Sequence, residues 1–122
     1  MYGAWWAAAL GGAIGATVRF LVNQAMRPAP GAFPWNTTAV NVVGCFAIGA
    51  CAAWFETRIP TASAWRVFWM TGILGGLTTF SAFGLDFYRL LRLGAGWAAW
   101  GSVALQVFGG LAAVALGWRL FR

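Results

Sequence analysis

The polar residues of this chain gather in the middle of an apolar stretch, in the run Gly75-Gly76-Leu77-Thr78-Thr79-Phe80-Ser81-Ala82-Phe83. Adjacent glycines weaken a helix, and the hydroxyl side chains offer hydrogen-bond donors. Inside a lipid bilayer, unpaired backbone groups are tolerated only beside protein or a cavity. A helix that is broken at this depth can turn its carbonyl oxygens towards an ion. We therefore expect the helix that carries this run to be broken at mid-membrane, at the functional centre.

The neighbouring polar groups are mainly hydrogen-bond donors, which suits binding of an anion. Asn41 lies between Val40 and Val42 in a second apolar stretch. A buried carboxamide without partners is costly, so an isolated asparagine here would be read as a bridge between helices. Beside the glycine–threonine run, we interpret its amide hydrogens as donors that face an anion path. The hydroxyls of Thr79 and Ser81 can add donors, although such groups often bond to their own helix.

An aromatic stripe accompanies these donors. Phe80, Phe83 and Phe87 recur at helical spacing, so they share one face of a helix. Such a stripe is commonly packing. However, an aromatic ring has a positive edge, and two edges aimed into a narrow passage can replace water around a small anion. We interpret Phe80 and Phe83 as lining such a passage.

Four other polar residues lie within or near the apolar stretches. Arg19 is either a snorkelling arginine or part of an electropositive vestibule that gathers anions. Ser102 and Gln106 lie one helical turn apart and either line the same passage or join helices. Asp86 has the wrong sign to attract an anion and could pair with an arginine, so we assign it no direct contact.

Catalysis is not expected from these residues. The chain has no His and no Lys, and its carboxylates, Glu56 and Asp86, are far apart in sequence. Acid–base or nucleophilic catalysis needs a poised base beside a reacting group. Cys45 and Cys51 lie inside one apolar stretch, where we interpret them as small packing residues and not as a disulfide framework or metal site.

The composition indicates how these residues are positioned. Of the 122 residues, 61% are hydrophobic and only 8% are charged, whereas soluble domains carry roughly a quarter charged residues. A helix needs about 20 apolar residues to cross a bilayer. Tryptophans cluster at the ends of the apolar stretches, as they do at membrane interfaces. We predict an all-α membrane protein that forms a single domain over residues 1–122, with four transmembrane helices over 5–26, 35–55, 65–87 and 97–121. No Lys or Arg precedes Arg19, so we expect no cleaved signal peptide.

The charges favour a particular assembly. The net charge of +6 comes from arginines that are spread over the segment ends, which fits membrane anchoring and not nucleic-acid binding. Four arginines would lie on one side of the membrane and three on the other, too weak a bias to fix an orientation. We expect dual topology and an antiparallel pair, and the small residues in every segment also favour a dimer. The two groups are Arg58, Arg66, Arg119 and Arg122, and Arg27, Arg89 and Arg92.

Three motifs, in order and correctly spaced, resemble the CrcB/Fluc family of fluoride channels. The run 75–83 matches the family signature Gly-Gly-Leu-Thr-Thr-Phe-Ser-Thr-Phe except at Ala82. The first segment carries Gly12-x-x-Gly15-x-x-x-Arg19, and the second carries Asn41-x-x-Gly44-x-Phe46-x-x-Gly49. The resemblance covers the whole chain in length and layout.

The resemblance implies a fold, a function and a metal. It implies an antiparallel homodimer in the bacterial inner membrane, with two narrow pores that let fluoride leave the cell passively and so protect it. Asn41, Phe80 and Phe83 match pore-lining residues of the family. The resemblance also implies a structural sodium ion on the dimer axis, held by the backbone carbonyls of Gly75 and Thr78 from both subunits. Two further departures are Asp86, where the family usually has Glu, and a fourth segment without Tyr.

The sequence leaves two other functions open. Small multidrug-resistance transporters are also short four-helix proteins, but they rely on a membrane-embedded Glu in the first helix, and this first segment has no carboxylate. A non-transporting subunit of a larger complex would show no flux alone. Pairing with an oppositely oriented paralogue, in place of a second copy, is also open.

Overall fold

The computed structural model describes residues 2–59 and 63–122, and all regular structure within these residues is helical. The prediction of four long apolar helices is confirmed, because four helical runs are long and apolar enough to cross a membrane. The first two are η1 (Tyr2–Ala4) with α1 (Trp5–Ala25), and α2 (Trp35–Arg58). The third consists of α3 (Ala64–Arg66), the π-helical η2 (Val67–Leu74), α4 (Gly75–Leu77) and α5 (Phe80–Arg92). The fourth consists of α6 (Gly96–Ala104), the π-helical η3 (Leu105–Gly109) and α7 (Gly110–Phe121).

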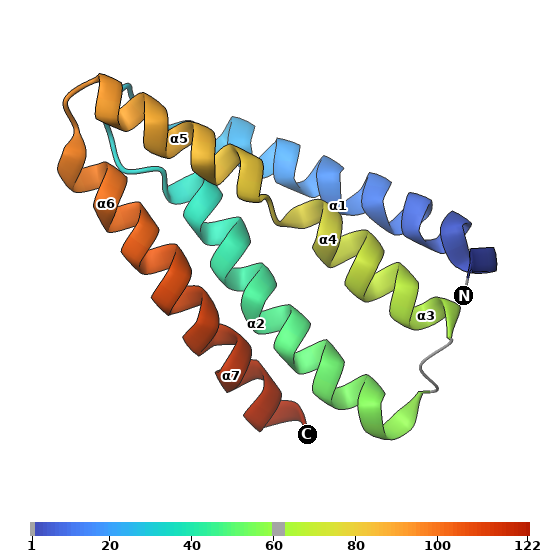
Figure 1. Cartoon of the computed structure of the whole chain (residues 1–122). Helices are drawn as coiled ribbons and strands as arrows, with labels where there is room; N and C mark the ends of the chain where they lie inside the picture. The colour runs from blue at the N-terminus through green and yellow to red at the C-terminus, as the bar shows by residue number, and fades with distance from the viewer. Residues whose placement is uncertain (1, 60–62) are drawn as a thin grey trace.

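The helices associate in pairs (Figure 1). The helix α1 lies along η2 and α4, α2 lies along α7, and α5 packs on α6. The α1–α2 and α5–α6 connections meet at one end of the bundle, and the two termini lie towards the other end. This up-and-down arrangement places the middle of the third helical run beside the middle of α2.

Glycines allow the backbones of α1 and the third helical run to touch. A Cβ atom on Gly11 would lie 2.8 Å from the Cα atom of Gly72, and one on Gly76 would lie 2.7 Å from the carbonyl oxygen of Gly12. Real Cβ atoms do not approach other heavy atoms this closely. These glycines therefore set the separation of the two helices, as small residues do in membrane proteins.

The pair formed by α2 and α7 uses the same device. A Cβ atom on Gly49 would lie 3.0 Å from the Cα atom of Val114, and one on Gly117 would lie 2.9 Å from the backbone nitrogen of Ala50. Both glycines are buried in the single chain. Two glycine-lined seams thus join the four helical runs in two pairs.

The turn between α5 and α6 explains why α5 stops where it does. Gly94 has a φ of 74°, and the Ala95 N–H donates to the Leu90 carbonyl at 2.9 Å while the Gly94 N–H donates to that of Leu91 at 3.1 Å. This is a Schellman motif with glycine in the left-handed position. Leu90 and Ala95 also belong to a small buried cluster, against which Phe87 packs.

Two helices continue beyond the apolar ranges expected to cross the membrane. The helix α2 runs to Arg58 and α5 runs to Arg92. Hydropathy marks the lipid-facing part of a helix, whereas arginine is itself a good helix former. The helices therefore project past the apolar range before they end.

Candidate functional site

The third helical run is interrupted by two threonines. The helix α4 ends at Leu77 and α5 begins at Phe80; between them Thr78 has φ −85° and ψ 154°, and Thr79 has φ −151° and ψ 121°. Thr78 donates its hydroxyl to the Leu74 carbonyl at 2.9 Å. The Thr79 hydroxyl oxygen accepts the Ala82 N–H at 3.1 Å, which is the N-cap of α5. One threonine therefore ends the first half-helix and the other starts the second.

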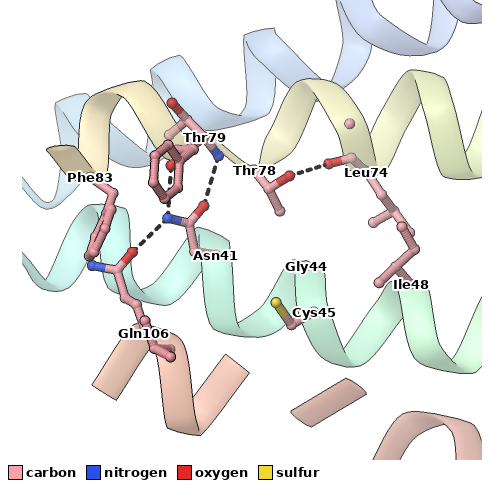
Figure 2. Close-up of a pocket in the computed structure, with 12 residues that line it drawn as sticks. Asn41, Gly44, Cys45, Ile48, Leu74, Thr78, Thr79, Phe83 and Gln106 are labelled. Carbon is pink, nitrogen blue, oxygen red and sulfur yellow. Dashed lines mark hydrogen bonds between the residues drawn. The ribbon is translucent and has the colours of Figure 1, made fainter. Parts of the chain in front are cut away.

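Asn41 satisfies the backbone of this interruption (Figure 2). Its Oδ1 accepts the Thr79 N–H at 2.8 Å, and its Nδ2 donates to the Thr79 carbonyl at 3.0 Å. A single carboxamide thus pairs with both backbone groups of one extended residue, as a neighbouring strand would. Buried backbone groups require such partners. Asn41 therefore bridges α2 and the third helical run, and it holds the interruption open.

The same carboxamide extends the network to the fourth helical run. The Asn41 Nδ2 also donates to Gln106 Oε1 at 2.6 Å, and Gln106 Nε2 donates to the Thr38 hydroxyl at 3.3 Å. Gln106 lies in the π-helical segment η3, and single π-helical turns occur frequently at functional sites. Both amide hydrogens of Asn41 consequently have protein acceptors in the single chain.

A cavity of about 370 Å³ lies beside this network, between α2, the interrupted helix and η3. Its polar groups come from Asn41, Gln106 and the two threonines of the interruption, and the rest of its wall is apolar. Gly44 lies opposite Thr78, where an added Cβ atom would clash with the Thr78 methyl group. The lining residues are Asn41, Gly44, Cys45, Ile48, Leu74, Gly75, Thr78, Thr79, Phe80, Phe83, Gln106 and Val107.

Two of the three phenylalanines in the predicted stripe line the cavity. The rings of Phe80 and Phe83 have centroids 5.5 Å apart and are tilted by 43°. Phe83 is half-buried, whereas Phe80 is 83% exposed in the single chain. Phe87 does not join them; its ring packs against Trp100 with centroids 4.9 Å apart.

The carbonyls of Gly75 and Thr78 fit the role of cation ligands. In a continuous helix the Thr79 N–H would donate to the Gly75 carbonyl, but here it donates to Oδ1 of Asn41. The Ala82 N–H, which would serve Thr78, donates to the Thr79 hydroxyl. Among residues 2–59 and 63–122, neither carbonyl oxygen receives a hydrogen bond. Oxygen atoms without donors suit a hard cation.

Side-chain metal ligands are not gathered anywhere in the described chain. No group of three or more His, Cys, Asp or Glu residues occurs among residues 2–59 and 63–122. Cys45 and Cys51 are both free thiols. A cation at the interruption would therefore be held by backbone oxygens.

Arg19 reaches the interruption from α1. Its Nε donates to the carbonyl of Gly76 at 3.1 Å, and the contact is partly buried. Gly76 belongs to the short helix α4, whose C-terminal carbonyls attract positive charge. The structure thus places Arg19, predicted for a vestibule, against the same backbone that carries Gly75 and Thr78.

The remaining predicted residues lie at different distances from the cavity. Ser81 is exposed, with its hydroxyl 3.3 Å from that of Thr79. Ser102 is fully buried, donates to the Ala99 carbonyl of its own helix at 2.9 Å, and does not line the cavity. Of the two predicted fourth-helix residues, the structure therefore brings only Gln106 to the site.

Asp86 finds a hydroxyl partner. Its Oδ2 accepts from the Thr37 hydroxyl at 2.8 Å, and the structure shows no arginine paired with it among the described residues. The sequence interpretation missed Thr37 and Thr38, which are both buried on α2. Thr38 lies one helical turn before Asn41 and so shares its face, a signal that could have identified it.

The fold and the site define a helical membrane protein with an interrupted helix beside a mainly apolar cavity that carries a few polar side chains. A family model described as CrcB-like protein, Camphor Resistance (CrcB), matches residues 6–118. The chain belongs to this family.

Several relatives match almost the whole chain. A protein of Rhizobium etli (strain CIAT 652) named fluoride-specific ion channel FluC is 46% identical over 115 residues, covering 93% of this chain and 92% of the relative. A protein with the same name from Agrobacterium fabrum is 43% identical over 118 residues, covering 93% of this chain and 94% of the relative. Another from Desulfotalea psychrophila is 40% identical over 111 residues, covering 91% of this chain and 86% of the relative. Together with the four apolar helices, these relatives show a multi-pass membrane protein.

Proposed function

We propose that this chain forms a fluoride-selective ion channel that lets fluoride leave the cell passively and protects it against fluoride toxicity. The observation that carries the proposal is the cavity at the helix interruption, where Asn41, Thr79 and two phenylalanine rings converge, in a chain whose full-length relatives are named fluoride-specific ion channels. These relatives are channels and not enzymes, in agreement with the expectation from the sequence.

The chemistry of the cavity suits a small, strongly hydrated anion. Fluoride gives up its water only where several donors replace it. Asn41 places its amide group at the cavity, and the hydroxyls of Thr79 and Ser81 lie within 3.3 Å of each other at the start of α5. Phe80 and Phe83 can turn positive ring edges towards the anion. The remainder of the wall is apolar, and a low local dielectric strengthens each hydrogen bond to the anion.

We further propose that two copies assemble antiparallel, with two pores. Phe80 is 83% exposed in the single chain although it is a large aromatic residue, and Gly75 is exposed beside it. The interruption separates half-helices of similar length within the run Ala64–Arg92, which supports a position at mid-membrane. The weak arginine bias allows both orientations, and a second copy would cover this face. We place the dimer in the bacterial inner membrane.

A structural sodium ion at the dimer axis is part of the proposal. The carbonyl oxygens of Gly75 and Thr78, from both subunits, would hold it, since they have no donors among the described residues. When bound, the ion supplies a fixed positive charge between the two anion paths, which lowers the cost of a dehydrated anion. The Asn41 side chain accepts the Thr79 N–H and so keeps that donor from the Gly75 carbonyl.

Removal of sodium should therefore impair the dimer. We expect purified protein in which N-methylglucamine replaces sodium to lose most of its fluoride flux and to melt at lower temperature, because unpaired carbonyls would remain at a depth without water. Flux assays and melting curves in the two salts measure both effects. Identical behaviour in both salts would contradict a structural sodium ion.

The driving force for export needs no pump. Fluoride enters acid-exposed cells as neutral HF and ionises inside, where lipid blocks the return of the anion. An inside-negative potential drives each anion outward by about 2.3 kcal/mol per 100 mV. A passive and selective pore is therefore enough for protection.

Efflux from liposomes tests the proposal. Purified protein is reconstituted with internal fluoride or chloride, and release is followed by an ion-selective electrode after a potassium ionophore is added. We expect rapid fluoride release and no chloride release above that of empty liposomes. A folded dimer in sodium that releases neither anion would contradict a channel made by this chain alone and would point to a missing partner, such as an oppositely oriented paralogue.

A further inference from the structure

We propose that Gln106 gates the Asn41 donor. In the empty pore its side-chain oxygen accepts a hydrogen bond from the Asn41 amide, and it releases that amide hydrogen when fluoride enters. This inference rests on the proposed function and assigns to Gln106 a part in choosing the anion. It makes Gln106 more than a polar residue along the wall of the cavity.

The two hydrogen bonds donated by Asn41 differ in how they can be released. One goes to the backbone carbonyl of Thr79 at 3.0 Å, which is fixed by the interruption itself. The other goes to Oε1 of Gln106 at 2.6 Å, a side chain with several rotatable bonds. Only the second bond can open without disturbing the backbone. The amide hydrogen that points to Gln106 is therefore the one available to an entering anion.

The surroundings of Gln106 allow it to withdraw. Within the described residues 2–59 and 63–122, its Nε2 is held only by the Thr38 hydroxyl at 3.3 Å, at the long end of the range for hydrogen bonds. In the single chain the side chain borders the cavity of about 370 Å³, which gives it volume into which it can rotate. Its place in the π-helical segment η3 widens the helix locally and sets the carboxamide against α2.

Competition for one hydrogen atom gives this arrangement selectivity. The amide oxygen of Gln106 is a neutral acceptor, whereas fluoride is a compact anion whose hydrogen bonds are charge-assisted and stronger. Fluoride can displace the oxygen. Chloride is larger and spreads its charge over more surface, so it accepts a weaker hydrogen bond and displaces the oxygen less readily. Breaking the bond between Asn41 and Gln106 costs the same for either anion, and only the stronger hydrogen bond of fluoride repays that cost.

The variant Gln106→Met removes the competing oxygen while keeping the length of the side chain. Initial efflux rates from liposomes at increasing internal fluoride give the half-saturating concentration. We expect this concentration to fall about tenfold, the net worth of one hydrogen bond, and chloride release to rise above background. The matched control is Gln24→Met at the exposed end of α1, outside the cavity, which should leave both measurements unchanged.

Two further variants keep the inference testable if Gln106→Met does not assemble. Gln106→Glu should raise the half-saturating concentration, since a carboxylate holds the Asn41 donor more strongly and repels fluoride. Thr38→Val removes the hydroxyl that holds the Gln106 side chain and should lower the half-saturating concentration by about twofold. The effect is smaller because the hydrogen bond between Gln106 and Asn41 is weakened and not removed.

The outcomes separate this inference from the proposed function. Wild-type protein that conducts fluoride, with a half-saturating concentration and chloride release that neither Gln106→Met nor Thr38→Val alters, would overturn the gate alone. A lower maximal flux with unchanged half-saturation would also overturn it, because Gln106 would then only support the structure. Wild-type protein that does not conduct would contradict the channel itself.

Discussion

The seam between α2 and α7 and the cavity at the helix interruption lie on the same helix and are built in opposite ways. In the seam, Gly49 and Gly117 bring backbone against backbone and leave no room for a Cβ atom. At the cavity, Asn41, Gln106 and Thr79 hold the elements apart through side-chain hydrogen bonds around about 370 Å³ of space.

The difference shows how a small helical protein can keep an interrupted helix in place. Backbone hydrogen bonds lost at Thr78 and Thr79 weaken the third helical run, so its position must be fixed by something other than its own continuity. The glycine contacts with α1 do this on one side, and Asn41 does it on the other. Tight seams and a loosely filled cavity are therefore parts of one arrangement.

The largest expected effect comes from filling a seam. In Gly15→Val the new Cβ atom would collide with the Ile73 carbonyl and lie 2.8 Å from the Leu77 backbone nitrogen, so α1 could no longer pack on the third helical run. We expect the yield of monodisperse protein in size-exclusion chromatography to fall by at least about tenfold, since a clash with backbone costs several kcal/mol. The control Gly12→Ala, whose Cβ atom meets nothing within 4 Å, should behave as wild type. Normal yield of Gly15→Val would show that the seam is not tight.

A change in the cavity should affect flux and leave assembly intact. Phe80→Ile and Phe83→Ile keep apolar volume but remove the positive ring edge, so fluoride efflux should fall on the order of tenfold per substitution while the elution volume is unchanged. Phe87→Ile is the matched control, because this ring packs on Trp100 away from the cavity. Unchanged efflux in both the Phe80 and the Phe83 variant would show that the ring edges do not contribute to fluoride conduction.

A smaller effect separates two roles for Arg19, which joins the α1 seam to the interruption. If its charge alone matters, Arg19→Lys should conduct as wild type and Arg19→Gln should not. Because the Nε of Arg19 donates to the Gly76 carbonyl, we expect the fluoride efflux rate of Arg19→Lys to fall as well, by about threefold to tenfold. A fall of this size corresponds to the net free energy of one charge-assisted hydrogen bond that is partly exposed to solvent. Full activity of Arg19→Lys would instead support the vestibule.

Much of the fold follows from the sequence, because hydropathy and the positions of tryptophan are local properties. The four apolar helices were predicted on this basis, and the structure confirms them. The run 75–83 also drew attention to the residues where the backbone becomes extended. Adjacent glycines followed by β-branched threonines are a local signal of a weak helix.

The partners of the site residues could not be read in the same way. Asn41 and Gln106 are 65 positions apart, so their contact depends on how α2 packs against η3. The π-helical segments shift the register of side chains that a regular α-helix would predict, which is one reason why Gln106 borders the cavity and Ser102 does not. The length of an arginine side chain likewise hid the contact of Arg19 with Gly76.

The central claim is that the anion passes Asn41, and efflux from Asn41→Asp tests it most directly. Aspartate can still accept the Thr79 N–H, but it cannot donate to an anion and it places a negative charge in the path. We expect fluoride efflux to drop to the level of empty liposomes while the dimer remains intact, and the matched variant Asn23→Asp, which keeps its acceptor for Asn36, to conduct. Fluoride efflux of Asn41→Asp equal to wild type would contradict the account and leave Asn41 as a bridge between helices.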